Sequence, residues 1–200
     1  MTQLSKAQNA QQDYIQWGES TFQVFEKIVM NDASMWHYFC VCENITLYID
    51  TEGCPYIQMV QISTDHDENI YVFNKERFLR QYNKILFNSK SKKIFWDISG
   101  EISRLKQIFP LPSSSDSTET DLKAARKCLR AKVCTELNCE DLQEKFSKMS
   151  LKHAIGFKYG VELQVNNRET FYKNKFWKYP DQQHLIYAAL DVQVMKELVD

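Results

Sequence analysis

The chain has 200 residues, of which 44% are hydrophobic and 26% charged, a composition that suits one large globular domain. Its formal net charge of -1 at pH 7 excludes a strong non-specific nucleic-acid binder, so any role with nucleic acid must depend on a local patch or a bound metal. No apolar run is long enough to span a membrane, and the polar N-terminus lacks the apolar segment of a secretory signal. We therefore expect a protein of the cytoplasm or nucleus without a membrane partner.

The six cysteines lack the paired C-x-x-C spacing that is typical of structural zinc sites. We expect them to be reduced thiols, with zinc binding as the less favoured alternative.

The first half of the chain is expected to contain most of the strands. Residues 1–20 are polar and predict a tail or a loosely docked helix, so the domain is expected to cover residues 21–200. Short apolar or alternating runs predict strands at 22–30 (an edge strand), 45–49 (a central strand), 55–63, 69–74 and 92–98. Helical spacing predicts helices at 32–44, 75–87 and 99–109, with caps at Asp32 or Ser34 and at Ser99.

The second half is expected to be helical. Helices are predicted at 121–132, 138–149, 150–160 and 181–199, after a Pro- and Ser-rich loop at 110–120. Hairpins supply antiparallel strand pairs, and helix-linked strands supply parallel ones. The sequence therefore predicts an α/β fold with a mixed central sheet flanked by helices.

Two carboxylates follow the predicted central strand in the run NITLYIDTEG. Asp50 and Glu52 stand at positions i and i+2 of an extended chain, so their side chains project from the same face. Like charges at this spacing repel unless one is protonated or a cation lies between them, and hard divalent cations take such oxygen ligands. The alternative is a strand end that reaches water.

Two more acids lie further along the chain, on predicted helices. Glu101 is near the start of the helix at 99–109, and Asp191 lies in the last helix, four residues after Tyr187 and on the same face. If these acids converge with the first pair, the cluster can hold two metal ions about 4 Å apart and catalyse hydrolysis.

These motifs together resemble the tyrosine-containing branch of the DEDD 3′–5′ exonuclease superfamily, the group of RNase D- and Werner exonuclease-like domains. LYIDTEG resembles the first motif, KKIFWDISGEISRL the second and YAALD the third, and PYIQMVQIS resembles the strand after the first motif. The resemblance extends from about residue 22 to the end, and it implies a ribonuclease H-like fold.

The resemblance implies that the chain is a 3′–5′ exonuclease of single-stranded nucleic acid, with RNA expected rather than DNA, and that it uses Mg²⁺ or Mn²⁺ in a two-metal site. Asp50 would bridge both ions, and Glu52 and Asp191 would complete the tighter site. Glu101 would lie near the looser ion, and Tyr187 would orient the attacking water.

The second motif departs from the family pattern, because Glu101 stands where Asp is usual, and the longer side chain displaces the carboxylate by roughly an ångström. The departure leaves a second hypothesis open. In it, the chain is a weak or inactive exonuclease-like domain that serves as an adapter, binding RNA or a protein partner in an RNA-processing or small-RNA complex.

The segment at residues 168–180 interleaves cations with aromatic rings just before the third motif. Cations neutralise phosphates and aromatic faces stack bases, as binding of a single strand requires. A loop packed beneath the last helix, with solvated lysines, is the equal alternative. The residues predicted to bind nucleic acid are Arg168, Tyr172, Lys173, Lys175, Trp177 and Lys178.

Overall fold

The structure is a computed structural model, and it describes residues 16–17, 20–21, 27–53, 56–110, 118–147, 149–151, 153–154, 180 and 182–199. Six strands form its main sheet, in the order β3-β6-β5-β4-β7-β8. Their bounds are Ile28–Met30 (β3), Thr46–Glu52 (β4), Met59–Thr64 (β5), Ile70–Phe73 (β6), Lys92–Phe95 (β7) and Cys139–Asp141 (β8).

The sheet is mixed. Strand β5 pairs antiparallel with both β4 and β6, whereas β3 pairs with β6, β4 with β7, and β7 with β8 in parallel. The strand that carries Asp50 and Glu52 therefore lies inside the sheet, and β3 lies at its edge. These features confirm the predicted mixed sheet, its central strand and its edge strand.

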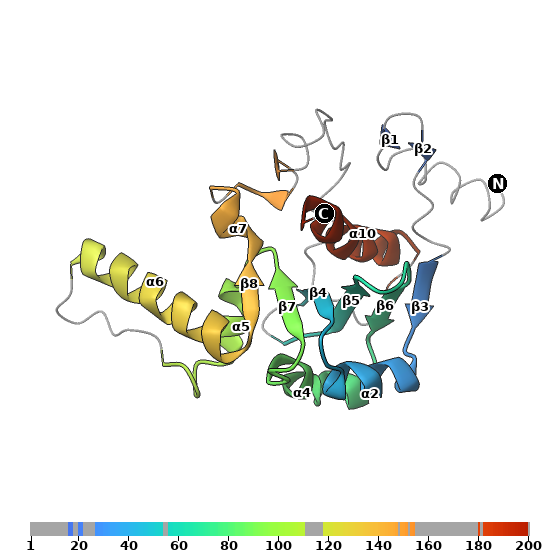
Figure 1. Cartoon of the computed structure of the whole chain (residues 1–200), viewed down its shortest axis with the longest axis horizontal. Coiled ribbons are helices and arrows are strands. Elements are labelled where there is room, and N and C mark those ends of the chain that lie inside the picture. Colours follow the sequence, from blue (N-terminus) through green and yellow to red (C-terminus); the bar gives the residue numbers. More distant parts are fainter. Residues whose placement is uncertain are drawn as a thin grey trace.

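Helices cover both faces of the sheet (Figure 1). Helix α10 (Gln182–Val199) packs on one face, where its buried stripe meets Tyr48, Met59, Ile70 and Ile94. Helices α2 (Ala33–Val41), α3 (Glu76–Leu79) and α4 (Tyr82–Leu86) supply side chains to the larger core on the other face. The stripe of α10 contains the predicted residues Leu185, Ala188, Ala189, Val192 and Met195.

The alternation of side chains along β4 decides which of its residues face α10. Leu47 and Ile49 belong to the α2 side of the core, and Tyr48 belongs to the α10 side. Because successive strand residues point to opposite faces, Asp50 and Glu52 continue the α10 side and Thr51 continues the α2 side.

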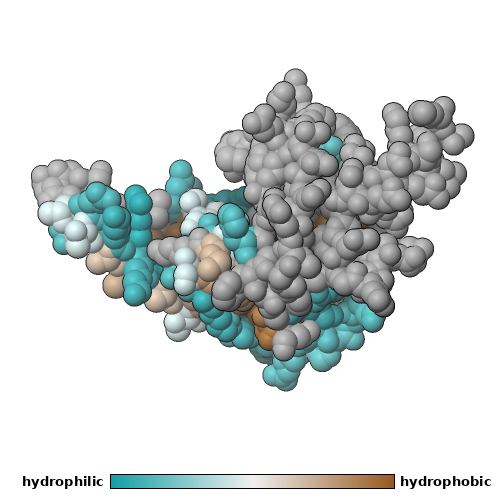
Figure 2. All heavy atoms as spheres, turned by 90° about the horizontal axis from the view of Figure 1, so that it is seen from above, coloured by the Kyte–Doolittle hydropathy of each residue, from teal (hydrophilic) through white to brown (hydrophobic). Residues whose placement is uncertain are grey.

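Three further helices extend from the β7–β8 edge of the sheet. Helix α5 (Ser99–Arg104) follows β7, and the long α6 (Glu119–Glu136) leads into β8, which continues directly into α7 (Leu142–Lys145). Most of α6 is exposed, and Figure 2 shows hydrophilic side chains along it, at the left of the view. None of the helices in the described part of the chain is both long and apolar enough to cross a membrane.

The structure corrects several predicted elements. The predicted helix at 75–87 is two short helices, because Gln81 leaves the helical conformation and its N–H bonds to the Phe78 carbonyl at 2.8 Å. The predicted helix at 138–149 begins instead as β8, whose three residues pair with β7.

Two smaller predictions are also corrected. Ser99 is the first residue of α5 rather than its cap, and its N–H donates to the Asp97 carboxylate at 2.9 Å. Residues 16–17 and 20–21, placed in the predicted tail or helix, are the strands β1 (Gln16–Trp17) and β2 (Ser20–Thr21), which pair antiparallel.

Candidate metal centre

Three of the four predicted acids come together in the structure. Asp50, Glu52 and Asp191 each offer a carboxylate oxygen, and these oxygens lie within 4.8 Å of one another. Strand β4 supplies the first two residues and α10 the third, across 139 positions of sequence. All three residues are half-buried, so the cluster is still open to solvent.

The crowding of these acids changes their protonation. Burial, followed by the Asp50 and Asp191 carboxylates, raises the pKa of Glu52 from 4.5 to about 10. Burial, the Asp191 carboxylate and the Glu101 carboxylate raise the pKa of Asp50 well above its ordinary value. Without a cation, the cluster therefore holds protons near neutral pH, and a bound cation would compete for the same oxygens.

The antiparallel partner of β4 contributes an unusual buried residue. Gln61 on β5 stands directly across from Asp50 and is 0% exposed. Neither polar atom of its side chain has a hydrogen-bond partner among the described residues. Residues directly opposite in an antiparallel pair share a face, so an unsatisfied amide lies on the same side of the sheet as the acids.

Glu101 does not belong to the group of three acids. Its Oε1 accepts a hydrogen bond from Thr51 Oγ1 at 2.9 Å and forms an ion pair with Arg104 Nη1 at 2.8 Å. The Glu101 side chain is only 5% exposed. Burial raises the pKa of this carboxylate, and the Arg104 guanidinium and the Thr51 hydroxyl oppose that shift. Its predicted role near a looser metal ion remains a prediction.

Arg104 ties Glu101 to the end of β4. Its Nη1 also donates to Thr51 Oγ1 at 2.8 Å, and its Nη2 donates to the Gly53 carbonyl at 3.3 Å. Gly53 has a φ of 105°, a conformation that favours glycine, and a Cβ there would lie 2.5 Å from the Tyr56 carbonyl oxygen. The turn after β4 is thus fixed close to the guanidinium.

Thr51, Arg104 and Gln61 were not among the predicted site residues. The i+3 spacing of Arg104 from Glu101 was the available signal, because it places a cation beside the acid on one helix face. Gln61 gave only a weak signal, a polar residue inside an apolar strand.

Other predicted site residues lie partly or wholly outside the residues that the structure describes. The backbone of α10 places Tyr187 one turn before Asp191, but its side chain lies outside the described residues. The six residues predicted to bind nucleic acid, all between 168 and 178, also lie outside them.

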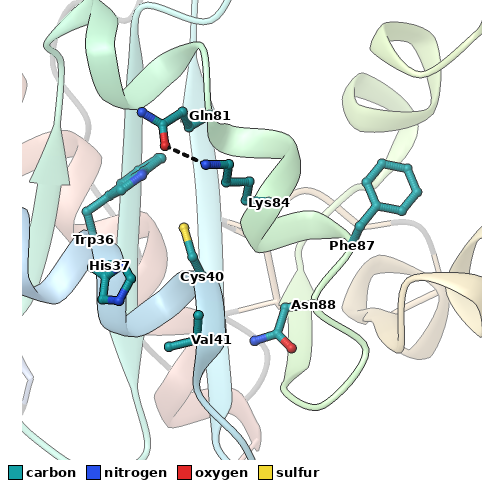
Figure 3. Close-up of a pocket in the computed structure, with 8 residues that line it drawn as sticks. All are labelled: Trp36, His37, Cys40, Val41, Gln81, Lys84, Phe87 and Asn88. Atoms are coloured by element: carbon teal, nitrogen blue, oxygen red, sulfur yellow. Dashed lines mark hydrogen bonds between the residues drawn. The ribbon is translucent and has the colours of Figure 1, made fainter.

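A surface pocket of about 510 Å³ lies between α2 and α4 (Figure 3). It is lined by residues such as Trp36, Cys40 and Phe87 and contains none of the predicted acids. Both helices belong to the core on the face of the sheet opposite α10, so the pocket is separate from the acid cluster.

The donor set of the cluster fits a hard divalent cation. Three carboxylate oxygens from two rigid elements are ligands that Mg²⁺ and Mn²⁺ prefer, and such an ion would relieve the repulsion that raises the pKa of Glu52. The cluster contains no cysteine or histidine.

Comparison with known proteins identifies the fold. No family model and no curated protein matches the sequence. RNase D of Trypanosoma brucei matches the structure with a TM-score of 0.59 at 15% identity, over 88% of this chain and 64% of that one. The chain thus spans just under two thirds of that protein's length. The Nibbler EXO domain of Aedes aegypti matches with a TM-score of 0.55 at 15% identity, over 93% of this chain and 90% of that domain.

These matches agree with the resemblance to DEDD exonucleases in the sequence motifs. In this chain, a six-stranded mixed sheet carries two acids at the end of β4, and the helix α10 adds a third acid beside them. The chain has the α/β, ribonuclease H-like fold of the RNase D and Nibbler exonuclease domains.

Proposed function

We propose that the chain is a metal-dependent 3′–5′ exonuclease domain that acts on single-stranded RNA. The observation that carries this proposal is the convergence of Asp50, Glu52 and Asp191 within 4.8 Å, in a fold shared with RNase D. RNA is favoured over DNA because a solved complex of Trypanosoma brucei RNase D with the RNA U12 matches this chain with a TM-score of 0.55 at 15% identity.

In this proposal, the three carboxylates hold Mg²⁺ or Mn²⁺ at the end of β4. When bound, such an ion stabilises negative charge on phosphate oxygens and favours ionisation of a water molecule. The rigid strand and helix keep the acids in place, and Tyr187, one turn before Asp191, orients the attacking water.

The reaction is hydrolysis of the last phosphodiester bond of the strand. Water attacks the phosphorus in line, the bond from phosphorus to the 3′ oxygen breaks, and that oxygen takes a proton. The products are a nucleoside 5′-monophosphate and a strand shortened by one nucleotide, with a free 3′ hydroxyl. The segment at 168–180, with its cations and aromatic rings, would hold the single strand next to the acids.

One observation favours the second candidate, a weak or inactive exonuclease-like domain that binds RNA or a protein partner as an adapter. Glu101 is paired with Arg104 and does not join the three-acid group. An acid that is held by a guanidinium is less available for catalysis than a free one.

A nuclease assay separates the two candidates. The chain is incubated with 5′-labelled single-stranded RNA and Mn²⁺ or Mg²⁺, beside an Asp50→Asn variant and a reaction that contains EDTA. We expect stepwise shortening from the 3′ end that stops in EDTA and falls at least about a hundredfold in the variant.

Binding of the same RNA, measured by fluorescence anisotropy, completes the test. RNA binding without metal-dependent shortening would favour the adapter. The absence of both activities would contradict each RNA-based proposal. A parallel reaction on single-stranded DNA of the same sequence tests the choice of RNA.

A further inference from the structure

Glu101, the acid of the second motif, is paired with Arg104 and lies outside the group of three acids that could hold a metal ion. The two-metal site implied by the sequence motifs would place this acid near the looser metal ion. Here its Oε1 already accepts hydrogen bonds from Arg104 Nη1 at 2.8 Å and Thr51 Oγ1 at 2.9 Å.

The three groups form a closed hydrogen-bond triangle. Arg104 donates to both Glu101 and Thr51, and the Thr51 hydroxyl donates to Glu101. The Arg104 guanidinium balances the negative charge of the Glu101 carboxylate, and Oε1 of that carboxylate already accepts two hydrogen bonds. The Gly53 carbonyl holds the second guanidinium nitrogen at 3.3 Å, which anchors the arginine from another direction.

The position of the guanidinium follows from the geometry of β4. Thr51 and Gly53 flank Glu52, so Arg104 contacts the chain on both sides of a residue of the acid cluster. The Arg104 side chain is 25% exposed and that of Glu101 only 5%, so the cation reaches solvent more than the acid with which it pairs. An arginine stays protonated at all ordinary pH values, and its charge opposes the approach of a divalent ion.

We propose that the Arg104 guanidinium takes the place of the second metal ion by neutralising Glu101, so that the chain binds a single divalent ion at Asp50, Glu52 and Asp191. This inference rests on the metal site of the proposed function and changes its stoichiometry. It assigns Arg104 as a positioning residue that orders the end of β4 without the help of a metal.

Metal stoichiometry tests the inference without any measurement of activity. Mn²⁺ is titrated into the whole 200-residue chain, with free Mn²⁺ followed by electron paramagnetic resonance. We expect one bound Mn²⁺ per chain. Two bound ions would overturn the inference and leave the metal site of the proposed function intact. If no Mn²⁺ binds, both the metal site of the proposed function and this inference are wrong.

Variants of the pair identify its role. Glu101→Gln is expected to change the Mn²⁺ dissociation constant less than about threefold, whereas removal of a metal-site acid such as Asp191 by Asp191→Asn weakens binding about tenfold or more. If Glu101→Gln instead weakens binding as strongly as Asp191→Asn, Glu101 is a ligand and the inference is wrong.

Removal of the guanidinium should open the second position. Arg104→Met keeps the aliphatic stem and is expected to bind two Mn²⁺ ions, whereas Arg104→Lys keeps the charge and binds one. Arg80→Met is the matched control, since Arg80 pairs with Glu76 on an exposed surface, and it should bind one ion. One ion in Arg104→Met, with a folded far-ultraviolet circular dichroism spectrum, would contradict the assignment of Arg104. If Arg104→Met does not fold, the Glu101→Gln and wild-type titrations decide the question.

Discussion

Replacement of Glu52 by glutamine should raise the stability of the metal-free chain and reduce the stabilisation that a bound metal ion provides. The pKa of Glu52 rises from 4.5 to about 10 in the folded chain, chiefly through burial and the Asp50 carboxylate. Between these two values the folded chain holds a proton that the unfolded chain has released. Unfolding therefore releases a proton, and metal-free stability falls as the pH rises through this range.

The magnitude follows from the size of the shift. Each pH unit above 4.5 lowers the unfolding free energy by about 1.4 kcal/mol, which gives about 3 kcal/mol at pH 7. Glutamine has nearly the same shape and does not titrate, so Glu52→Gln removes this pH-dependent loss of unfolding free energy. For a chain of this length, the metal-free melting temperature should rise by about 6–12 °C.

The assay is thermal unfolding, followed by circular dichroism at about pH 6 and about pH 8, in EDTA and in excess Mn²⁺. In EDTA, the variant should be more stable than the wild type, and the difference should grow with pH. In excess Mn²⁺, the melting temperature of the wild type should rise more than that of the variant, because the variant has lost a metal ligand. Glu119→Gln, on the exposed surface of α6, is the control and should shift the melting temperature by less than about 2 °C. An unchanged or lower metal-free melting temperature for Glu52→Gln at the higher pH would refute the reasoning.

Two further substitutions test the packing around the site, by urea unfolding. Phe39→Ala should lower the unfolding free energy by about 4 kcal/mol, because the ring is 0% exposed and packs edge-on against Tyr71 at 5.3 Å between ring centroids. A loss below about 1 kcal/mol would mean that the core closes around the cavity. Arg130→Met should cost about 3 kcal/mol, because it leaves Asp141, whose side chain is 3% exposed, without its cation. Lys123→Met on the same helix breaks an exposed pair and should cost about 0.5 kcal/mol or less, so equal costs for the two variants would contradict the argument.

Most of the strands could be predicted from the sequence, because their signals are local. The apolar run at 45–49 predicted the strand β4, and the alternation at 55–63 predicted the strand β5, which the structure places at Met59–Thr64. The helix cap at Asp32 could also be predicted from the sequence. In the structure, the Asp32 carboxylate accepts hydrogen bonds from the N–H groups of Ser34 and Met35 at 2.8 and 3.0 Å. Strand β8 was missed because three half-polar residues carry little periodicity, and pairing with β7 alone makes them a strand.

For the candidate site, the sequence by itself determined that Asp50 and Glu52 share a face, because strand residues alternate with a period of two. It also placed Asp191 on a helix with a buried stripe that could dock on a sheet. Only the tertiary structure decided that this helix covers the face that bears the two acids, since the approach of segments 139 positions apart is not encoded locally.

The structure also decided the surroundings of Glu101. In the sequence it is an acid of the second motif, but in the fold Arg104 and Thr51 hold its carboxylate outside the three-acid group. The partner of a buried charge depends on which side chains the packing brings within about 3 Å, and motif spacing alone does not determine that choice.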